Sequence, residues 1–116
     1  MYTLRCLMIL AASFAGATLA CEYPPLVAIP DGENATLEEM LEGQTSVRAY
    51  QAAMNEFLVC TLEGLNASGP NAVEEYAQIM AARHDYAYAE METVAEIFNK
   101  QVQAYRAANP PEPESE

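Results

Sequence analysis

The longest regular pattern in this sequence lies between Asn71 and Arg106, where apolar residues recur every three or four positions. This spacing keeps apolar side chains on one face of a helix, with a period close to the coiled-coil heptad. His84, the only histidine, occupies one position of the same stripe. The sequence therefore predicts one long helix over residues 70–106. Its apolar stripe consists of Val73, Ala77, Met80, Ala87, Met91, Val94, Phe98, Val102 and Tyr105.

A second helical pattern precedes this one. Thr36 and Glu39 have the spacing of a capping box, in which each side chain accepts a hydrogen bond from the other residue's backbone N–H. Gly43 and Gly64 weaken the helical pattern that follows, because glycine is a poor helix former. The pattern nevertheless predicts a helix over residues 36–66. Its apolar stripe consists of Met40, Val47, Tyr50, Met54, Phe57, Leu58, Thr61 and Leu65.

A short turn joins the two predicted helices. Gly69 suits the C-terminal cap of the first helix, and Pro70 suits the entry to the second. Asn71 precedes Glu74 by three residues, which predicts a second capping box. Because so short a connection makes two helices antiparallel neighbours, the predicted fold class is all-α, an antiparallel two-helix hairpin.

Residues 1–20 have the pattern of an export signal. One positive charge, Arg5, precedes an uncharged and mostly apolar run that ends in Thr18-Leu19-Ala20. We predict cleavage after Ala20, with Ala17 as a second candidate. The run is slightly shorter than the roughly 20 residues that span a bilayer comfortably, and an uncleaved anchor is the alternative. The sequence therefore predicts an exported protein, with the periplasm as its expected location.

Two cysteines remain after this cleavage, Cys21 and Cys60. An even number of cysteines in a small exported domain favours a disulfide. The alternative is lipidation of Cys21, which follows the signal directly, although bacterial lipoproteins usually carry leucine where this chain has Thr18. An extended segment over residues 21–35 is long enough to reach from Cys60 back to the start of the first helix.

That segment, residues 21–35, is called the arm. Its three prolines and the Asp31-Gly32 turn signal exclude a regular helix. Its apolar residues, Tyr23, Leu26, Val27 and Ile29, predict that it packs along the helices. At the other end, residues 107–116 are rich in proline and glutamate and predict a disordered acidic tail.

The chain is strongly acidic, with 17 Asp and Glu against 5 Lys and Arg and a formal net charge of −12. Such a surface repels nucleic acid and anionic lipid head groups. The sequence therefore predicts no nucleic-acid partner, and membrane association only through a lipidated Cys21. The glutamates fall on exposed or capping positions, where solubility is the simplest explanation for them.

His84 is the candidate ligand or pH-sensitive switch, with Tyr50 as its candidate partner. A hairpin folded about residues 67–69 places His84 opposite residues 50–54. A metal site needs further converging ligands, but the sequence has no second histidine and no His-x-x-x-His or Glu-x-x-His pair. We therefore favour a polar residue that fixes the register of the two helices, and expect no metal and no cofactor. The sequence also lacks a nucleophile beside a base and any phosphate-binding loop, so we expect no enzymatic activity.

A partial apolar strip lies on the predicted second helix, away from its main stripe, and consists of Ile79, Tyr86 and Ile97. It is the candidate interaction surface for an unknown protein partner or for self-association into a homodimer with four helices. Scattered surface residues are the alternative. The predicted function is a non-catalytic, exported, acidic helical protein that acts through protein contacts or as a small structural module. Two other functions stay open, a small-ligand or cation-binding protein centred on His84 and a lipidated envelope protein anchored at Cys21.

Several short runs carry a resemblance to known proteins. They are Cys21-Glu22-Tyr23-Pro24-Pro25, Arg83-His84-Asp85, Glu90-Met91-Glu92, Val94-Ala95, Phe98-Asn99 and Gln101-Val102, together with Tyr105. In these runs the chain resembles an uncharacterised family of small exported helical proteins of proteobacteria. The resemblance implies bacterial export and a helical fold, and it supplies no activity and no site residues.

Overall fold

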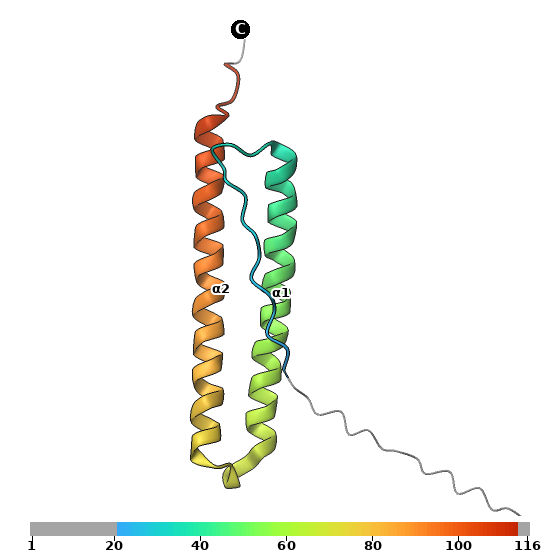
Figure 1. Cartoon of the computed structure of the whole chain (residues 1–116), viewed down its shortest axis with the longest axis vertical. Helices are drawn as coiled ribbons and strands as arrows, with labels where there is room; N and C mark the ends of the chain where they lie inside the picture. Colours follow the sequence, from blue (N-terminus) through green and yellow to red (C-terminus); the bar gives the residue numbers. More distant parts are fainter. Residues whose placement is uncertain (1–20, 114–116) are drawn as a thin grey trace, which may run out of the picture.

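The protein is a hairpin of two long helices in a computed structural model that describes residues 21–113. Helix α1 spans Leu37–Ser68, helix α2 spans Glu74–Ala108, and the short 3-10 helix η1, Gly69–Asn71, joins them. The two helices lie antiparallel and side by side (Figure 1). The described residues contain no strand, and the predicted all-α hairpin is confirmed. The predicted export signal, residues 1–20, and positions 114–116 of the predicted tail lie outside the described residues.

The start of α1 is the predicted capping box. The Thr36 backbone N–H donates to the Glu39 carboxylate at 2.7 Å, and the Glu39 N–H donates to the Thr36 hydroxyl oxygen at 3.2 Å. The hydrogen bonds from the Thr36 backbone and side chain lower the pKa of the Glu39 carboxyl. At the other end, Gly69 caps α1 with φ at 61°, a left-handed conformation that favours glycine.

The start of α2 differs from the prediction. Asn71 belongs to η1 and caps nothing, and α2 begins at Glu74 with no side-chain cap. The Val73 carbonyl instead accepts the first two backbone hydrogen bonds of the helix. Because η1 and the two residues after it separate the helices, the hairpin turns later in the chain than residues 67–69. Each residue of α2 therefore faces a position of α1 closer to the turn than predicted.

The core lies where the two predicted stripes meet. Its central residue is Met54, whose side chain is completely buried. Thr61 is also buried, and its hydroxyl donates to the Leu58 carbonyl at 2.8 Å. Val73, which the sequence placed in the stripe, is 66% exposed because it lies before the first turn of α2. The buried apolar residues are Met40, Val47, Tyr50, Met54, Phe57, Leu58, Met80, Ala87, Val94 and Phe98.

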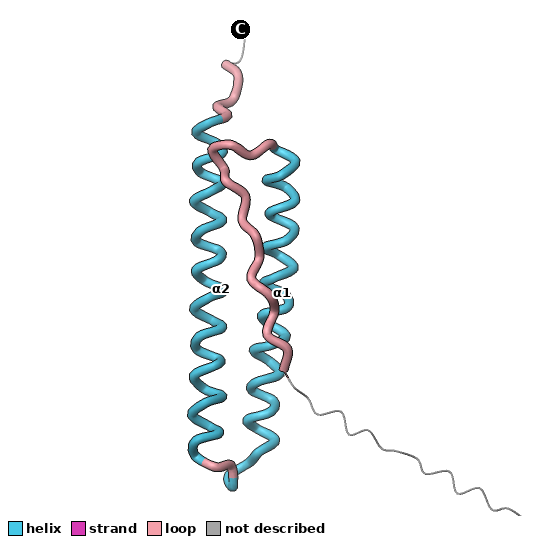
Figure 2. Tube along the Cα trace, viewed as in Figure 1, coloured by secondary structure: helices cyan, strands magenta, loops and turns pink. Residues whose placement is uncertain are grey.

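The arm crosses one side of the hairpin as an extended segment (Figure 2). A disulfide between Cys21 and Cys60 holds its beginning against α1, with the two Cα atoms 5.6 Å apart. Val27 and Ile29 pack against the core, as predicted. Leu26 does not, because its side chain is 73% exposed. The predicted disulfide is confirmed.

Two glycines allow close approach between the arm and the helices. Gly43 of α1 lies beneath the ring of Pro30, and a Cβ atom at position 43 would lie 2.6 Å from two ring carbons. Gly32 of the arm lies against the α2 backbone, and its N–H donates to the Gln101 side-chain oxygen at 2.8 Å. Gly43 weakens the helical pattern of the sequence, and the structure shows that it makes room for the arm.

Candidate functional site

A hydrogen-bonded cluster joins the arm to both helices near the middle of the hairpin. The Glu90 carboxylate of α2 accepts a hydrogen bond from the Tyr50 hydroxyl of α1 at 2.5 Å. It accepts a second one, at 2.8 Å, from the Tyr23 hydroxyl of the arm. Hydrogen bonds to an ionised carboxylate are stronger than bonds between neutral groups. The cluster therefore fixes the position of the arm relative to both helices.

The two phenols of this cluster hold their protons more tightly than a free tyrosine does. Burial is the main cause, and the hydrogen bond to Glu90 and its negative charge add to it, raising the pKa of Tyr23 to about 12. The same causes raise the pKa of Tyr50. At neutral pH both phenols therefore stay protonated and act as donors to the same carboxylate.

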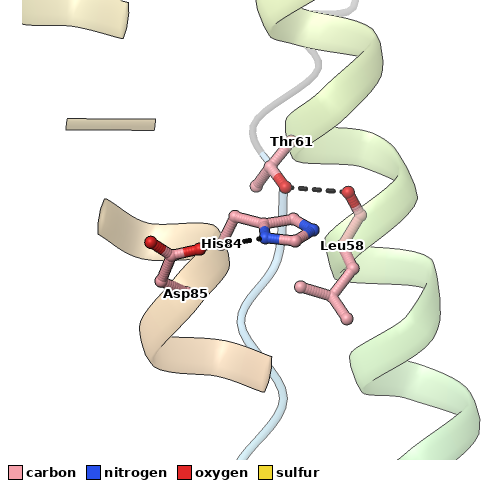
Figure 3. Close-up of polar contacts among 4 residues, drawn as sticks. All are labelled: Leu58, Thr61, His84 and Asp85. Atoms are coloured by element: carbon pink, nitrogen blue, oxygen red, sulfur yellow. Dashed lines mark hydrogen bonds and ion pairs between the residues drawn. The ribbon is translucent and has the colours of Figure 1, made fainter. Parts of the chain in front are cut away.

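His84 lies elsewhere than the sequence placed it. Figure 3 shows its ring facing Leu58 and Thr61 of α1, with Asp85 beside it. Its Nδ1 atom is 3.6 Å from an Asp85 carboxylate oxygen. The predicted placement opposite Tyr50 was wrong, because the turn ends later and brings Glu90 to that position instead. One signal for Glu90 was present in the sequence, since it lies one helical turn after Ala87 and one before Val94 and therefore borders the buried stripe.

The surroundings of His84 offer few ligands for a cation. Within residues 21–113, no group of three or more histidine, cysteine or acidic side chains lies close enough together to hold a metal ion. Asp85, the nearest acidic neighbour, has a side chain that is 86% exposed. His84 itself is half-buried at the edge of the core.

An aromatic groove lies beside the cluster, between the arm and α2. It has a volume of about 580 Å³. The Tyr23 ring forms one wall and meets the Phe57 ring edge to face, with centroids 4.9 Å apart. Edge-to-face packing of this kind favours a fixed ring orientation. The lining residues are Cys21, Tyr23, Phe57, Ile79, Ala82, Arg83 and Tyr86.

The groove contains two of the three residues of the predicted interaction strip. Ile79 is 55% exposed and Tyr86 is 67% exposed, and both line the groove. Ile97 is also exposed but does not line it. Two of the three residues of the predicted strip therefore share one groove, but the sequence did not show that Tyr23 of the arm would form the opposite wall.

Comparisons with known proteins show no matching family, no similar curated protein and no similar solved structure. Among residues 21–113, no helix is both long enough and apolar enough to span a membrane. The function is therefore inferred from the residues of this chain alone.

Proposed function

We propose that this protein is a non-catalytic, exported helical module that binds a partner protein through the aromatic groove. The observation that carries the proposal is the exposure of Tyr86 and Ile79 around a concave surface between the arm and α2. Exposed apolar surface bordered by polar groups is typical of protein interfaces, and tyrosine and arginine are enriched where binding energy concentrates.

Arg83 indicates the chemistry of the partner. It lines the groove, and within residues 21–113 it forms no ion pair. The chain has a net charge of −12, so a cation without an ion-pair partner beside an apolar groove is a distinctive feature. It favours a partner that carries an apolar side chain next to a carboxylate. The proposed partner segment therefore places an apolar side chain between Tyr23 and Tyr86 and an acidic side chain against Arg83.

The construction of the groove supports binding without a large rearrangement. The disulfide of Cys21 and the hydrogen bond from Tyr23 to Glu90 hold the arm wall in place before a partner arrives. A preformed surface loses less conformational entropy on binding.

The disulfide also bears on location. Disulfides persist in oxidising compartments such as the periplasm, which favours export. The sulfur atom of Cys21 is bonded to Cys60, so it has no free valence for a lipid thioether. Both observations favour a free exported protein over a lipid-anchored one. The cation-binding alternative has less support, because Asp85 is the only acidic side chain within residues 21–113 that pairs with His84.

Site-specific photocrosslinking in the native host tests this proposal. A photoreactive residue in place of Tyr86 should yield an adduct with one partner, and Arg83→Glu in the same chain should abolish that adduct. A photoreactive residue in place of Tyr88, two positions away and facing another direction, is the matched control and should not give this adduct. Equal capture of the same partner at both positions, or an adduct that persists in Arg83→Glu, would contradict the proposal.

A further inference from the structure

The arm covers only one side of the hairpin. On α1 the arm lies against Gly43 and Cys60, and on α2 it contacts Glu90 and Gln101. The opposite side, beyond the core residues, has no such cover among residues 21–113, and we call it the open side. A two-helix hairpin is a single layer, and domains are normally built from at least two layers packed around a core.

One row of α1 residues faces the open side. It runs from Leu37 to Asn66 in steps of 4, 3, 4, 3, 4, 4, 3 and 4 residues, which keeps it on one helical face. It includes Leu41, Arg48, Val59 and Leu62. The leucines and the valine of this row are all exposed, although each is large and apolar.

A matching row of α2 residues lies beside it. It runs from Ala77 to Arg106 in the same order of steps and includes His84, Tyr88, Met91 and Val102. Met91 and Val102 pack against the edge of the core but are only partly buried, and Tyr88 is 49% exposed. Both helices therefore expose large apolar side chains, separated by uncharged polar residues and arginines, on the same side of the hairpin.

Neither row contains an acidic residue. This absence is unusual in a chain with 17 acidic residues, many of them on these two helices. The helix carboxylates instead occupy the outer faces and, at Glu90, the side that the arm covers. Their place within the two rows is taken by amides and by two arginines, Arg48 and Arg106.

We propose that the open side binds a second copy of this chain, so that two hairpins form an antiparallel four-helix bundle. Two copies that meet at any other face bring their carboxylates together, whereas neither row of the open side contains a carboxylate. A basic partner would instead be attracted to the acidic outer faces. The two helices have 32 and 35 residues, so two equivalent layers can overlap along almost their whole length. This surface differs from the Ile79, Tyr86 and Ile97 strip, and the inference does not depend on the partner proposed for the aromatic groove.

Three of the polar residues in the two rows fit such an interface. Gln44, Gln51 and His84 are half-buried in the single hairpin, so they border the core on the open side. Polar side chains within an otherwise apolar helical interface fix its register and the number of helices. In the dimer they would therefore select one alignment of the two copies.

Sedimentation equilibrium of the purified, oxidised protein tests this inference through two matched pairs of variants. Tyr88→Glu and Ala81→Glu place a carboxylate on the open side, whereas Tyr86→Glu and Ala89→Glu place one on other faces of α2. All four positions are exposed, so the variants should keep the helix content of the unmodified chain. Circular dichroism verifies this.

The unmodified protein should sediment at twice the mass of its chain. Tyr88→Glu and Ala81→Glu should raise the dimer dissociation constant by at least about 100-fold, because they bury an unpaired charge in both copies. Tyr86→Glu and Ala89→Glu should leave it within about threefold. A monomer at every concentration would overturn the inference, and so would a dimer that survives Tyr88→Glu or is lost in Tyr86→Glu. Loss of the groove partner in Tyr86→Glu, with the dimer intact, would separate the two surfaces.

Discussion

The two sides of the hairpin differ in what covers the seam between the helices. On one side the arm lies across it, attached by the Cys21–Cys60 disulfide and by hydrogen bonds to Glu90 and Gln101. On the open side the core edge stays partly exposed at Met91 and Val102. On the arm side, an extended segment of 15 residues forms the covering layer, and a few specific attachments hold it there. A helical layer on the open side would need no such attachments, because apolar contact along two long helices suffices.

The disulfide is the attachment with the largest expected effect. Cys60→Ser should lower the free energy of unfolding by up to about 4 kcal/mol, since the loop that the bond closes spans 39 positions. Urea denaturation followed by circular dichroism measures this loss. The reduced unmodified protein should behave in the same way.

The same variant also sharpens the comparison of the two sides. The disulfide contributes nothing to the open side. The Cys60→Ser variant should therefore still sediment as a dimer under conditions in which the variant is folded. The aromatic groove should be weakened, since only the hydrogen bond to Glu90 would then hold Tyr23 beside Tyr86. A variant that loses both properties together while folded would show that the two sides are coupled.

The next effect concerns the contact between Pro30 and α1. Gly43→Ala should destabilise the protein by about 1–3 kcal/mol, because the new methyl group would overlap the proline ring. Gly64→Ala is the matched control in the same helix, where the nearest atom would be 3.6 Å away. That control should stabilise the protein by up to about 1 kcal/mol through helix propensity. Thermal unfolding distinguishes the two, and the same sign for both variants would show that the arm does not restrict position 43.

The smallest effect is a loss of stability in alkali, caused by the two tyrosines of the cluster. The pKa of Tyr23 is near 10 in the unfolded chain and about 12 in the folded protein. The folded protein therefore binds the phenol proton more tightly, and the protonated phenol stabilises the fold. The contribution is complete below about pH 10 and disappears as the pH rises through about 12. The pKa of Tyr50 is raised in the same direction. Urea denaturation midpoints measured across this range should therefore fall, and the fall should begin when the phenols of the unfolded chain start to ionise.

Phenylalanine variants test the origin of this pH dependence. Tyr50→Phe together with Tyr23→Phe should remove most of the alkaline decline and lower the stability at neutral pH by about 1–3 kcal/mol, because Glu90 loses both donors. Tyr88→Phe is the control on the open side, where the hydroxyl has no bonded partner among the described residues. An unchanged decline in the double variant would assign the pH dependence to other groups.

Much of the fold follows from patterns that are local in the sequence. Apolar residues at helical spacing predicted both buried stripes, with Met54 and Phe98 in the core. The Thr36 capping box involves residues three positions apart, so its geometry is set by the backbone of one helical turn. The disulfide followed from the number of cysteines and the reach of an extended arm.

The candidate site depended on contacts that no local pattern contains. The number of residues in the turn decides whether Tyr50 faces His84 or Glu90. The formation of η1 lengthens the turn and shifts the alignment of α2 along α1, so that Tyr50 faces Glu90. The aromatic groove needs Tyr23 and Tyr86 together, which are far apart in the sequence and meet only because the arm returns along the hairpin. The sequence alone determined which faces of each helix are apolar, because burial repeats with the helical period. Only the tertiary structure decided which of those faces the arm covers, because that depends on where the chain turns and where the arm is attached.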